Sequence, residues 1–176
     1  MGSGMDLKST HNLNLKHRSP TAGFTLVELL VVIAIIGILA TLLLLQLGVA
    51  RQRARDAKRI VDISQTRTAT ELYFDDNGQY PQVATWTALG TLFVPKYLTN
   101  MPVDPLNNGN YSYNYAFLGI TKYHMWAELE QNASALKSDA DINSSVGWTG
   151  QGINGGLETC LSQTVIDCVY DQGQNQ

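Results

Sequence analysis

The chain reads Gly23-Phe24-Thr25-Leu26-Val27-Glu28 and then continues through an unbroken run of apolar or small residues from Leu29 to Leu45. Glu28 carries the only formal charge between Phe24 and Ala50. A segment of this length can span a bilayer as a helix. Because a carboxylate inside such a helix costs several kcal/mol, Glu28 is the first candidate for a functional residue.

The order of the signals around the apolar run separates two interpretations. Gly23, the small residue that ends the leading segment, comes before the run, whereas a secretory signal peptide has its small-residue cleavage site after it. In the alternative interpretation, Gly48-Val49-Ala50 is an ordinary signal-peptidase site and a conventionally secreted soluble domain begins at Arg51. The two interpretations therefore predict different mature N-termini, Phe24 and Arg51.

The stretch Gly23-Phe24-Thr25-Leu26-Val27-Glu28-Leu29-Leu30, followed by the apolar run, resembles the processing site of the type IV pilin and pseudopilin superfamily. In that family a membrane peptidase cuts after the glycine and methylates the new terminal amine. The resemblance implies three regions. Residues 1–23 are a leader removed on maturation, residues 24–50 a transmembrane and assembly helix, and residues 51–176 an amphipathic helix with a globular pilin-like domain.

A second stretch, Leu72-Tyr73-Phe74-Asp75-Asp76-Asn77-Gly78-Gln79-Tyr80-Pro81, is similar to the major pseudopilin of type II secretion systems. The later Pro102 and Asp104-Pro105 resemble the same subgroup. Past Leu129 the likeness weakens, and a C-terminal cysteine pair is more like that of a type IV pilin. The resemblance therefore implies a structural subunit of a filament in a type II secretion-type system, with a type IV pilus or competence pilin as the alternative.

The sequence predicts an α+β fold, and the resemblance gives it the ladle form of the pilins. In that form a long N-terminal helix packs on a small antiparallel sheet with a loop-rich C-terminus. The helix is expected from Phe24 to about Asp76, with Gly78 as its C-cap. The remaining elements are expected as a short helix or turn over 86–98, strands over 111–117 and 123–129, a long surface loop over 132–156, and a last short strand at Val165-Ile166.

The predicted helix changes character after Ala50. Up to Leu47 it is apolar on every side, as contact with lipid requires. Beyond Ala50 it is amphipathic. One face carries Ala54, Ala57, Ile60 and Val61, and the opposite face carries Arg53, Asp56, Arg59 and Asp62.

The resemblance gives Glu28 and Phe24 a role in assembly. Cleavage leaves a charged amine on Phe24, and a carboxylate without a partner is costly in a low dielectric. Glu28 is therefore expected to pair with the Phe24 amine of a neighbouring subunit, the alternative being that lipid headgroups solvate it. Subunits that repeat head to tail make an interface that does not close, which gives a filament.

The resemblance also implies partners and a location. The partners are other copies of the chain, minor pilins or pseudopilins, the prepilin peptidase and an inner-membrane assembly platform. The location is the cytoplasmic membrane, crossed once, with the N-terminus inside and the C-terminal domain exported into an extracytoplasmic filament. Basic residues are denser after the apolar run than before it, which taken alone favours the opposite orientation. The alternative explanation is that the basic residues after the run serve packing between subunits of a filament.

Composition argues against two functional classes. The net charge is −3 and charged residues make up 15% of the chain, so no nucleic-acid partner is expected. We find no serine elbow, phosphate loop or metal-histidine pair, so no enzymatic activity is expected. His124 lies in a predicted strand, where packing is the more common role.

Two further sites lie near the C-terminus. Cys160 and Cys168 predict a disulfide in an exported domain, with two buried thiols as the alternative. The pattern Asp139-x-Asp141-x-Asn143 presents alternating oxygen ligands that suit calcium, the alternative being a solvated acidic loop. Major pseudopilins, which this chain resembles, bind calcium in their C-terminal loops, but that resemblance does not assign the ligands.

Overall fold

The computed structural model describes residues 23–162 and 164–175, so the predicted leader lies outside the described residues except for Gly23. The described elements are α1 (Leu26–Asn77), α2 (Trp86–Phe93), the 3₁₀ helix η1 (Ser134–Ser138), β1 (Tyr113–Leu118), β2 (Lys122–Glu128), β3 (Thr149–Gly150) and β4 (Val169–Gln174). The expected α+β fold is confirmed. The chain divides into two compact units, residues 1–42 and 43–176, and α1 contributes to both.

The first unit contains most of the apolar part of α1. Every described side chain from Phe24 to Leu44 is exposed, and the large apolar ones range from 46% exposed at Val32 to 80% at Phe24. Among the described residues, α1 is the helix that is long and apolar enough to cross a membrane. A continuous apolar surface of this size marks contact with lipid or with other protein.

In the second unit, α1 buries the face that carries charges. Asp56, Arg59 and Asp62 are buried and continue into Ile63 and Thr66 at helical spacing. Amphipathic helices normally turn their apolar face inward, but here Ala54, Ala57 and Val61 are exposed. The helix ends as expected, because Gly78 has φ +68° and donates its N–H to the Phe74 carbonyl over 2.7 Å.

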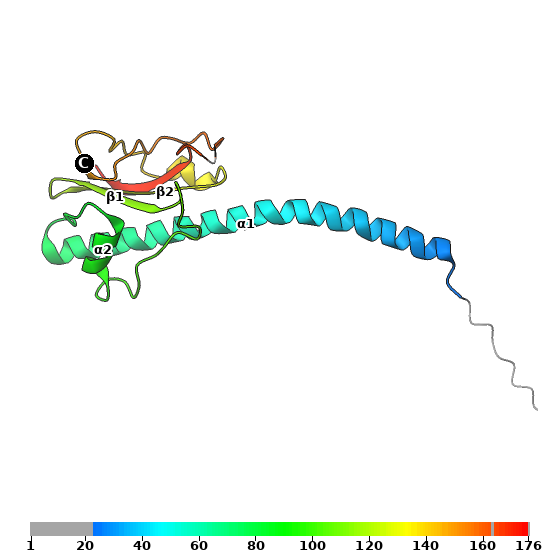
Figure 1. Ribbon diagram of the computed structural model, residues 1–176. Coiled ribbons are helices and arrows are strands. Elements are labelled where there is room, and N and C mark those ends of the chain that lie inside the picture. The colour runs from blue at the N-terminus through cyan, green and yellow to red at the C-terminus, as the bar shows by residue number, and fades with distance from the viewer. Residues whose placement is uncertain (1–22, 163, 176) are drawn as a thin grey trace, which may run out of the picture. The chain divides into compact units, whose positions relative to one another are not determined.

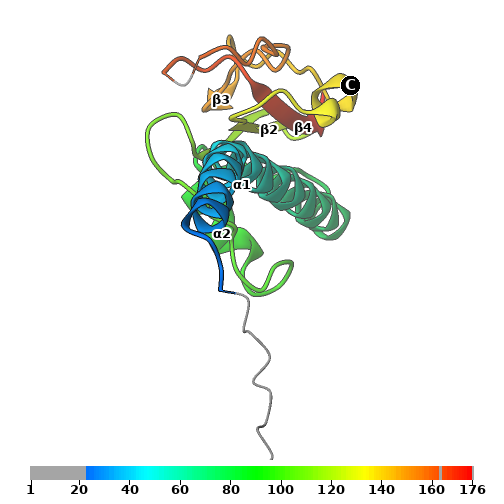
Figure 2. The same ribbon diagram turned by 90° about the vertical axis from the view of Figure 1, so that its right-hand side faces the viewer.

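The sheet has the strand order β3-β1-β2-β4, and each neighbouring pair is antiparallel. Figures 1 and 2 show it lying over the C-terminal half of α1. Its helix-facing side is rich in aromatic rings, and Tyr115 and Tyr123 are completely buried there. The predicted strands over 111–117 and 123–129 are confirmed to within two residues.

The other face of the sheet is covered by the C-terminal loops, which both views place on the side away from α1 (Figures 1 and 2). Several strand residues that alternate with the aromatic rings are polar and still buried, among them Asn114, His124 and Asp171. The prediction of a plain surface loop over 132–156 was therefore wrong. That segment contains η1 and β3, and it buries Ile142 against the sheet.

The last strand lies further along the chain than predicted. Thr164 and Val165 donate their N–H groups to the Ser162 hydroxyl, and Val165 is exposed. A strand at Val165-Ile166 was therefore a wrong prediction, and β4 starts only at Val169. Cys160 and Cys168 form a disulfide, and the Cys168 sulfur is buried beside the start of β4.

Arg59 is the centre of a buried ionic network that joins α1 to two other segments. Its side chain is completely buried and forms ion pairs with Asp104 at 2.7 Å, Asp56 at 2.8 Å and Glu130 at 2.9 Å. Burial alone would lower the pKa of Arg59, but the hydrogen bonds and charges of these carboxylates raise it. The guanidinium also lies 4.6 Å from the centre of the Tyr111 ring. Arg59 therefore stays charged and ties the turn at Asp104 and the end of β2 to the helix.

We predict that Arg59→Ala lowers the free energy of unfolding by about 3–5 kcal/mol, because it removes the cation that pairs with the buried Asp56 and Asp104, although Glu130 keeps its ion pair with Arg55. Arg53→Ala is the matched control on the same helix, since Arg53 is exposed, and it should change stability by no more than about 0.5 kcal/mol. Denaturant unfolding of the mature protein in detergent, followed by tryptophan fluorescence, measures both. Equal stability of the two variants would show that the network is not needed for the fold.

Candidate functional sites

The first site is the start of α1, where Thr25 and Glu28 cap the helix reciprocally. The Glu28 carboxylate accepts the Thr25 N–H at 2.8 Å and the Thr25 hydroxyl at 2.6 Å. In return, the Glu28 N–H donates to the Thr25 hydroxyl oxygen at 3.2 Å. This is a capping box, which satisfies helix N–H groups that have no partner within the helix.

The capping box corrects the expectation that Glu28 is poorly satisfied in a single subunit. Its carboxylate has partners on its own chain, so it does not start from a completely unpaired state. The motif Thr25-Leu26-Val27-Glu28, with a threonine three residues before a glutamate, is the signal in the sequence that indicates this capping box. A new partner for Glu28 must therefore compete with Thr25.

The predicted cleavage position is exposed and free of packing constraints. Gly23 and Phe24 precede the first residue of α1 and are exposed. A Cβ atom built on Gly23 would meet nothing within 4 Å. The described chain therefore gives no packing reason for glycine at this position, which is consistent with recognition of Gly23 by another protein.

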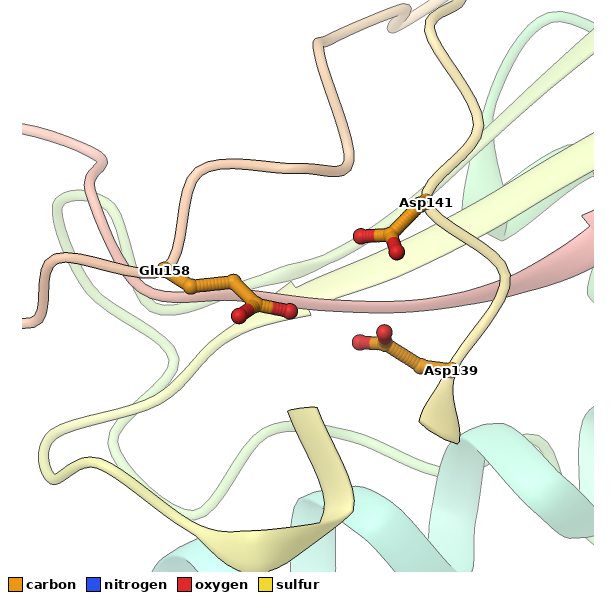
Figure 3. A group of neighbouring side chains, drawn as sticks. All are labelled: Asp139, Asp141 and Glu158. Atoms are coloured by element: carbon orange, nitrogen blue, oxygen red, sulfur yellow. The ribbon is translucent and has the colours of Figure 1, made fainter. Parts of the chain in front are cut away.

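The second site is an acidic cluster on the C-terminal loops, formed by Asp139, Asp141 and Glu158. One carboxylate oxygen from each lies within 4.8 Å of the others, and Figure 3 shows the three carboxylates pointing toward one another. Asp139 follows η1, and Glu158 reaches the site from the segment that pairs with Cys168 at the start of β4. The sequence pattern found two of these three residues.

Asn143, the third predicted ligand, takes a different role. Its side-chain oxygen accepts the Ser145 N–H at 3.1 Å and the Ser145 hydroxyl at 2.6 Å, so it closes a local turn. Asn143 therefore has a local structural role, and its part as a ligand stays a prediction, while the structure places Glu158 beside Asp139 and Asp141. Local spacing could not have revealed Glu158, because only the folding of the loops brings it beside Asp139.

The acidic cluster fits a hard cation by its donor chemistry. Asp139 Oδ1 is buried without a hydrogen-bond partner among the described residues. Burial raises the pKa of Asp139 to about 7, and the negative charges of Asp171, Asp141 and Glu158 act in the same direction. A divalent cation would supply the missing partner and offset the repulsion, since calcium prefers carboxylate oxygens.

Glu128 is a third buried acidic residue, and it anchors the disulfide loop. One oxygen accepts the N–H groups of Asp167 and Cys168, each at 3.1 Å, while the other is buried without a hydrogen-bond partner among the described residues. Burial raises the pKa of Glu128 to about 7, and the charge of Asp167 adds to this effect. Glu128 therefore takes up a proton more readily in the folded protein than in the unfolded chain.

This pKa predicts that the domain loses stability as the pH rises through 7. The folded-state pKa lies above the usual value of 4.5, so the stabilising contribution of Glu128 is fully present below pH 4.5 and is lost above about 7. The loss amounts to at most about 3 kcal/mol. Thermal melting of the mature protein between pH 5 and 8 in calcium-free buffer should show the decline.

Glu128→Gln, which cannot ionise, should reduce this pH dependence. Asp139 has the same direction of shift, so part of the decline should remain in the variant. An unchanged pH profile in Glu128→Gln would show that Glu128 is already ionised in the folded protein at pH 5.

The N-terminal site lies within a stretch of sequence that matches a known family. A family model described as the prokaryotic N-terminal methylation motif matches residues 18–44. These residues contain the Thr25–Glu28 capping box and most of the exposed apolar part of α1. No solved structure matches the chain significantly.

Several curated proteins are similar over longer stretches. The type IV wide pilus major component PilA4 of Thermus thermophilus is 41% identical over 125 residues, which cover 70% of this chain and 92% of that protein. The type II secretion system core protein G of Pseudomonas aeruginosa is 33% identical over 142 residues, which cover 71% and 95%. The protein of the same description in Escherichia coli K12 is 33% identical over 97 residues, which cover 49% and 67%.

Proposed function

The chain belongs to the family of type IV pilins and type II secretion pseudopilins, and from this premise we propose that it is the major structural subunit of a type II secretion-type filament. A prepilin peptidase removes residues 1–23 and methylates the amine of Phe24. The mature subunit then assembles through α1. The observation that carries this proposal is the continuous exposed apolar surface of α1 directly after the Thr25–Glu28 capping box.

A type IV pilus or competence pilin is the second candidate. The relative described as a type IV wide pilus major component matches at 41% identity over nearly its whole length. A disulfide between Cys160 and Cys168 near the C-terminus also favours this alternative. Both candidates use the same processing and the same helix, and they differ in the length and location of the filament.

The exposed side of α1 in the second unit supports assembly through the helix. Ala54, Ala57 and Val61 are exposed, and Val61 retains 51% of its surface. They form an exposed surface of small and apolar residues, while the charged face is turned into the domain. Small residues let helices approach closely, so this surface suits helices of neighbouring subunits in a filament core.

Glu28 provides the specific contact in this proposal. Cleavage after Gly23 creates a charged amine on Phe24, and the carboxylate of a neighbouring subunit can exchange Thr25 for this amine. A carboxylate–ammonium pair in a low dielectric is stronger than a hydrogen bond to a hydroxyl. The exchange thus favours the assembled state and sets the axial step between subunits.

The proposal also assigns partners and a location. The subunit is held in the cytoplasmic membrane by residues 24–50, with its N-terminus on the cytoplasmic side and residues 51–176 exported. It contacts other copies of itself, minor pilins or pseudopilins, the peptidase and an inner-membrane assembly platform. A secreted soluble domain beginning at Arg51 would instead discard the apolar part of α1.

The charge of Glu28 can be tested apart from its capping role with Glu28→Gln, because glutamine also completes a capping box. The variant should be inserted and cleaved normally but should lose filament yield, since a pair worth about 3 kcal/mol changes subunit affinity by roughly a hundredfold. Thr41→Val, which removes a polar group elsewhere in the same apolar segment, is the control. Filaments sheared from cells and quantified by immunoblot measure the yield, and wild-type yield from Glu28→Gln would contradict the pairing role.

We further propose that the acidic cluster of Asp139, Asp141 and Glu158 binds calcium. The buried oxygen of Asp139 and the convergence of three carboxylates support this proposal. A bound ion would connect the loop after η1 to the segment that precedes the disulfide.

Calcium should raise the melting temperature of the mature protein, and chelator should reverse the increase. An ion that binds only the folded state stabilises it by about 2.7 kcal/mol at a hundredfold excess over its dissociation constant. Glu158→Gln should abolish the response, whereas Asn143→Ala should retain it, because Asn143 serves a local turn. The opposite result, in which Asn143→Ala loses the calcium response and Glu158→Gln keeps it, would contradict Glu158 as a ligand. It would favour the ligands predicted from the sequence, Asp139, Asp141 and Asn143.

A further inference from the structure

Three buried polar side chains lie directly beneath the acidic cluster. His124 on β2 and Asp171 on β4 point to the loop-covered face of the sheet, and both are completely buried, while Ser144 is 2% exposed. His124 Nδ1 lies 2.6 Å from Ser144 Oγ. The other ring nitrogen, Nε2, lies 2.8 Å from Asp171 Oδ2, although outside hydrogen-bond geometry.

Asp171 holds the backbone of the cluster. Its carboxylate accepts three consecutive N–H groups, those of Ala140 and Asp141 at 3.0 Å and that of Ile142 at 2.8 Å. Its own N–H donates to Asp139 Oδ2 at 3.2 Å. Asp171 thereby keeps Asp141 in a left-handed conformation, with φ +49°, that few non-glycine residues adopt.

Ser144 connects this loop to the segment that carries Glu158. Its hydroxyl oxygen accepts the Ile153 N–H at 2.9 Å, and its N–H donates to the Ile153 carbonyl at 2.8 Å. Gly155 allows the close approach that follows, because a Cβ atom there would come within 2.3 Å of the Asp171 carboxylate. His124 therefore lies between the two groups that fix the two loop segments.

A Ser-His-Asp constellation suggests hydrolysis, but this arrangement does not present a nucleophile. The Ser144 hydroxyl is buried beneath the loops and already bonds to the N–H and the carbonyl of Ile153. A nucleophile needs an accessible oxygen next to donors that stabilise an oxyanion. The bonds formed by Ser144 and Asp171 run instead to the backbone of the loops.

We propose that Asp171, His124 and Ser144 are positioning residues for the acidic cluster, holding the loops so that Asp139, Asp141 and Glu158 converge on a divalent cation. The inference rests on the proposed calcium site. Groups that orient ligands in this way typically change metal affinity by tenfold to a hundredfold when they are removed.

Ser144→Ala tests this in the mature full-length chain in detergent, with calcium chloride as the probe and isothermal titration calorimetry as the measurement. The dissociation constant should rise by about tenfold or more. Tyr113→Phe is the matched control, because it removes a buried hydroxyl bonded to Asp62 on the opposite face of the sheet. It should destabilise the fold comparably while leaving the calcium affinity within about twofold.

A second measurement does not require calcium. In Asp171→Asn without calcium, the amides of Ala140, Asp141 and Ile142 should exchange hydrogen faster than in the wild type, while the amides of β2 keep their protection. Wild-type calcium affinity in Ser144→Ala, or unchanged exchange in Asp171→Asn, overturns the positioning role alone. A wild-type chain that does not bind calcium overturns the proposed cation site and this inference together.

Discussion

The apolar surface of α1 is the constraint on which the rest of the structure depends. Within the described chain, no other segment covers it. From Phe24 to Leu44 the described side chains of α1 are all exposed. Burying one large aliphatic side chain is worth about 1.5–3 kcal/mol, so this segment as a whole favours an apolar environment by tens of kcal/mol. Such an energy exceeds the cost of the single carboxylate at Glu28 and places the segment in a bilayer or against other helices.

The same magnitudes show why one carboxylate matters for assembly. Lipid tails are as apolar as neighbouring side chains, so moving α1 from bilayer to filament gains little from the hydrophobic effect. The remaining free-energy difference between the bilayer and the filament comes from helix packing and from the partners of Glu28. Because the capping box already gives Glu28 a partner within its own subunit, the proposed pairing contributes only the difference in free energy between the contact with Thr25 and the contact with a neighbour's amine.

In the second unit, α1 buries a charged face against the domain and exposes a face of small and apolar residues. Arg59 and its carboxylate partners occupy the buried face, where an apolar stripe would ordinarily lie. A buried ionic network contributes less stability than well-packed apolar residues would, but it leaves Ala54, Ala57 and Val61 on the outside. The helix can therefore hold its own domain with one face and a neighbouring helix with another.

The elements that local patterns determine were predictable, and those that depend on the covering loops were not. The end of α1 and the hairpin of β1 and β2 follow from glycine and aromatic alternation. Polar residues at the alternate positions of β2, such as Glu128, normally indicate a solvated face, and only the folded loops bury them. The same loops supply Glu158 and leave Asn143 to a turn, because residues distant in sequence meet only after the sheet has formed.

Within this fold, the decisive question is whether the mature protein keeps the apolar part of α1. Intact mass and N-terminal sequencing of protein purified from membranes answer it. We predict that the first residue is Phe24, with a methylated amine. A mature N-terminus at Arg51 would contradict it, because the helix proposed to anchor and assemble the subunit would then be absent from the functional protein.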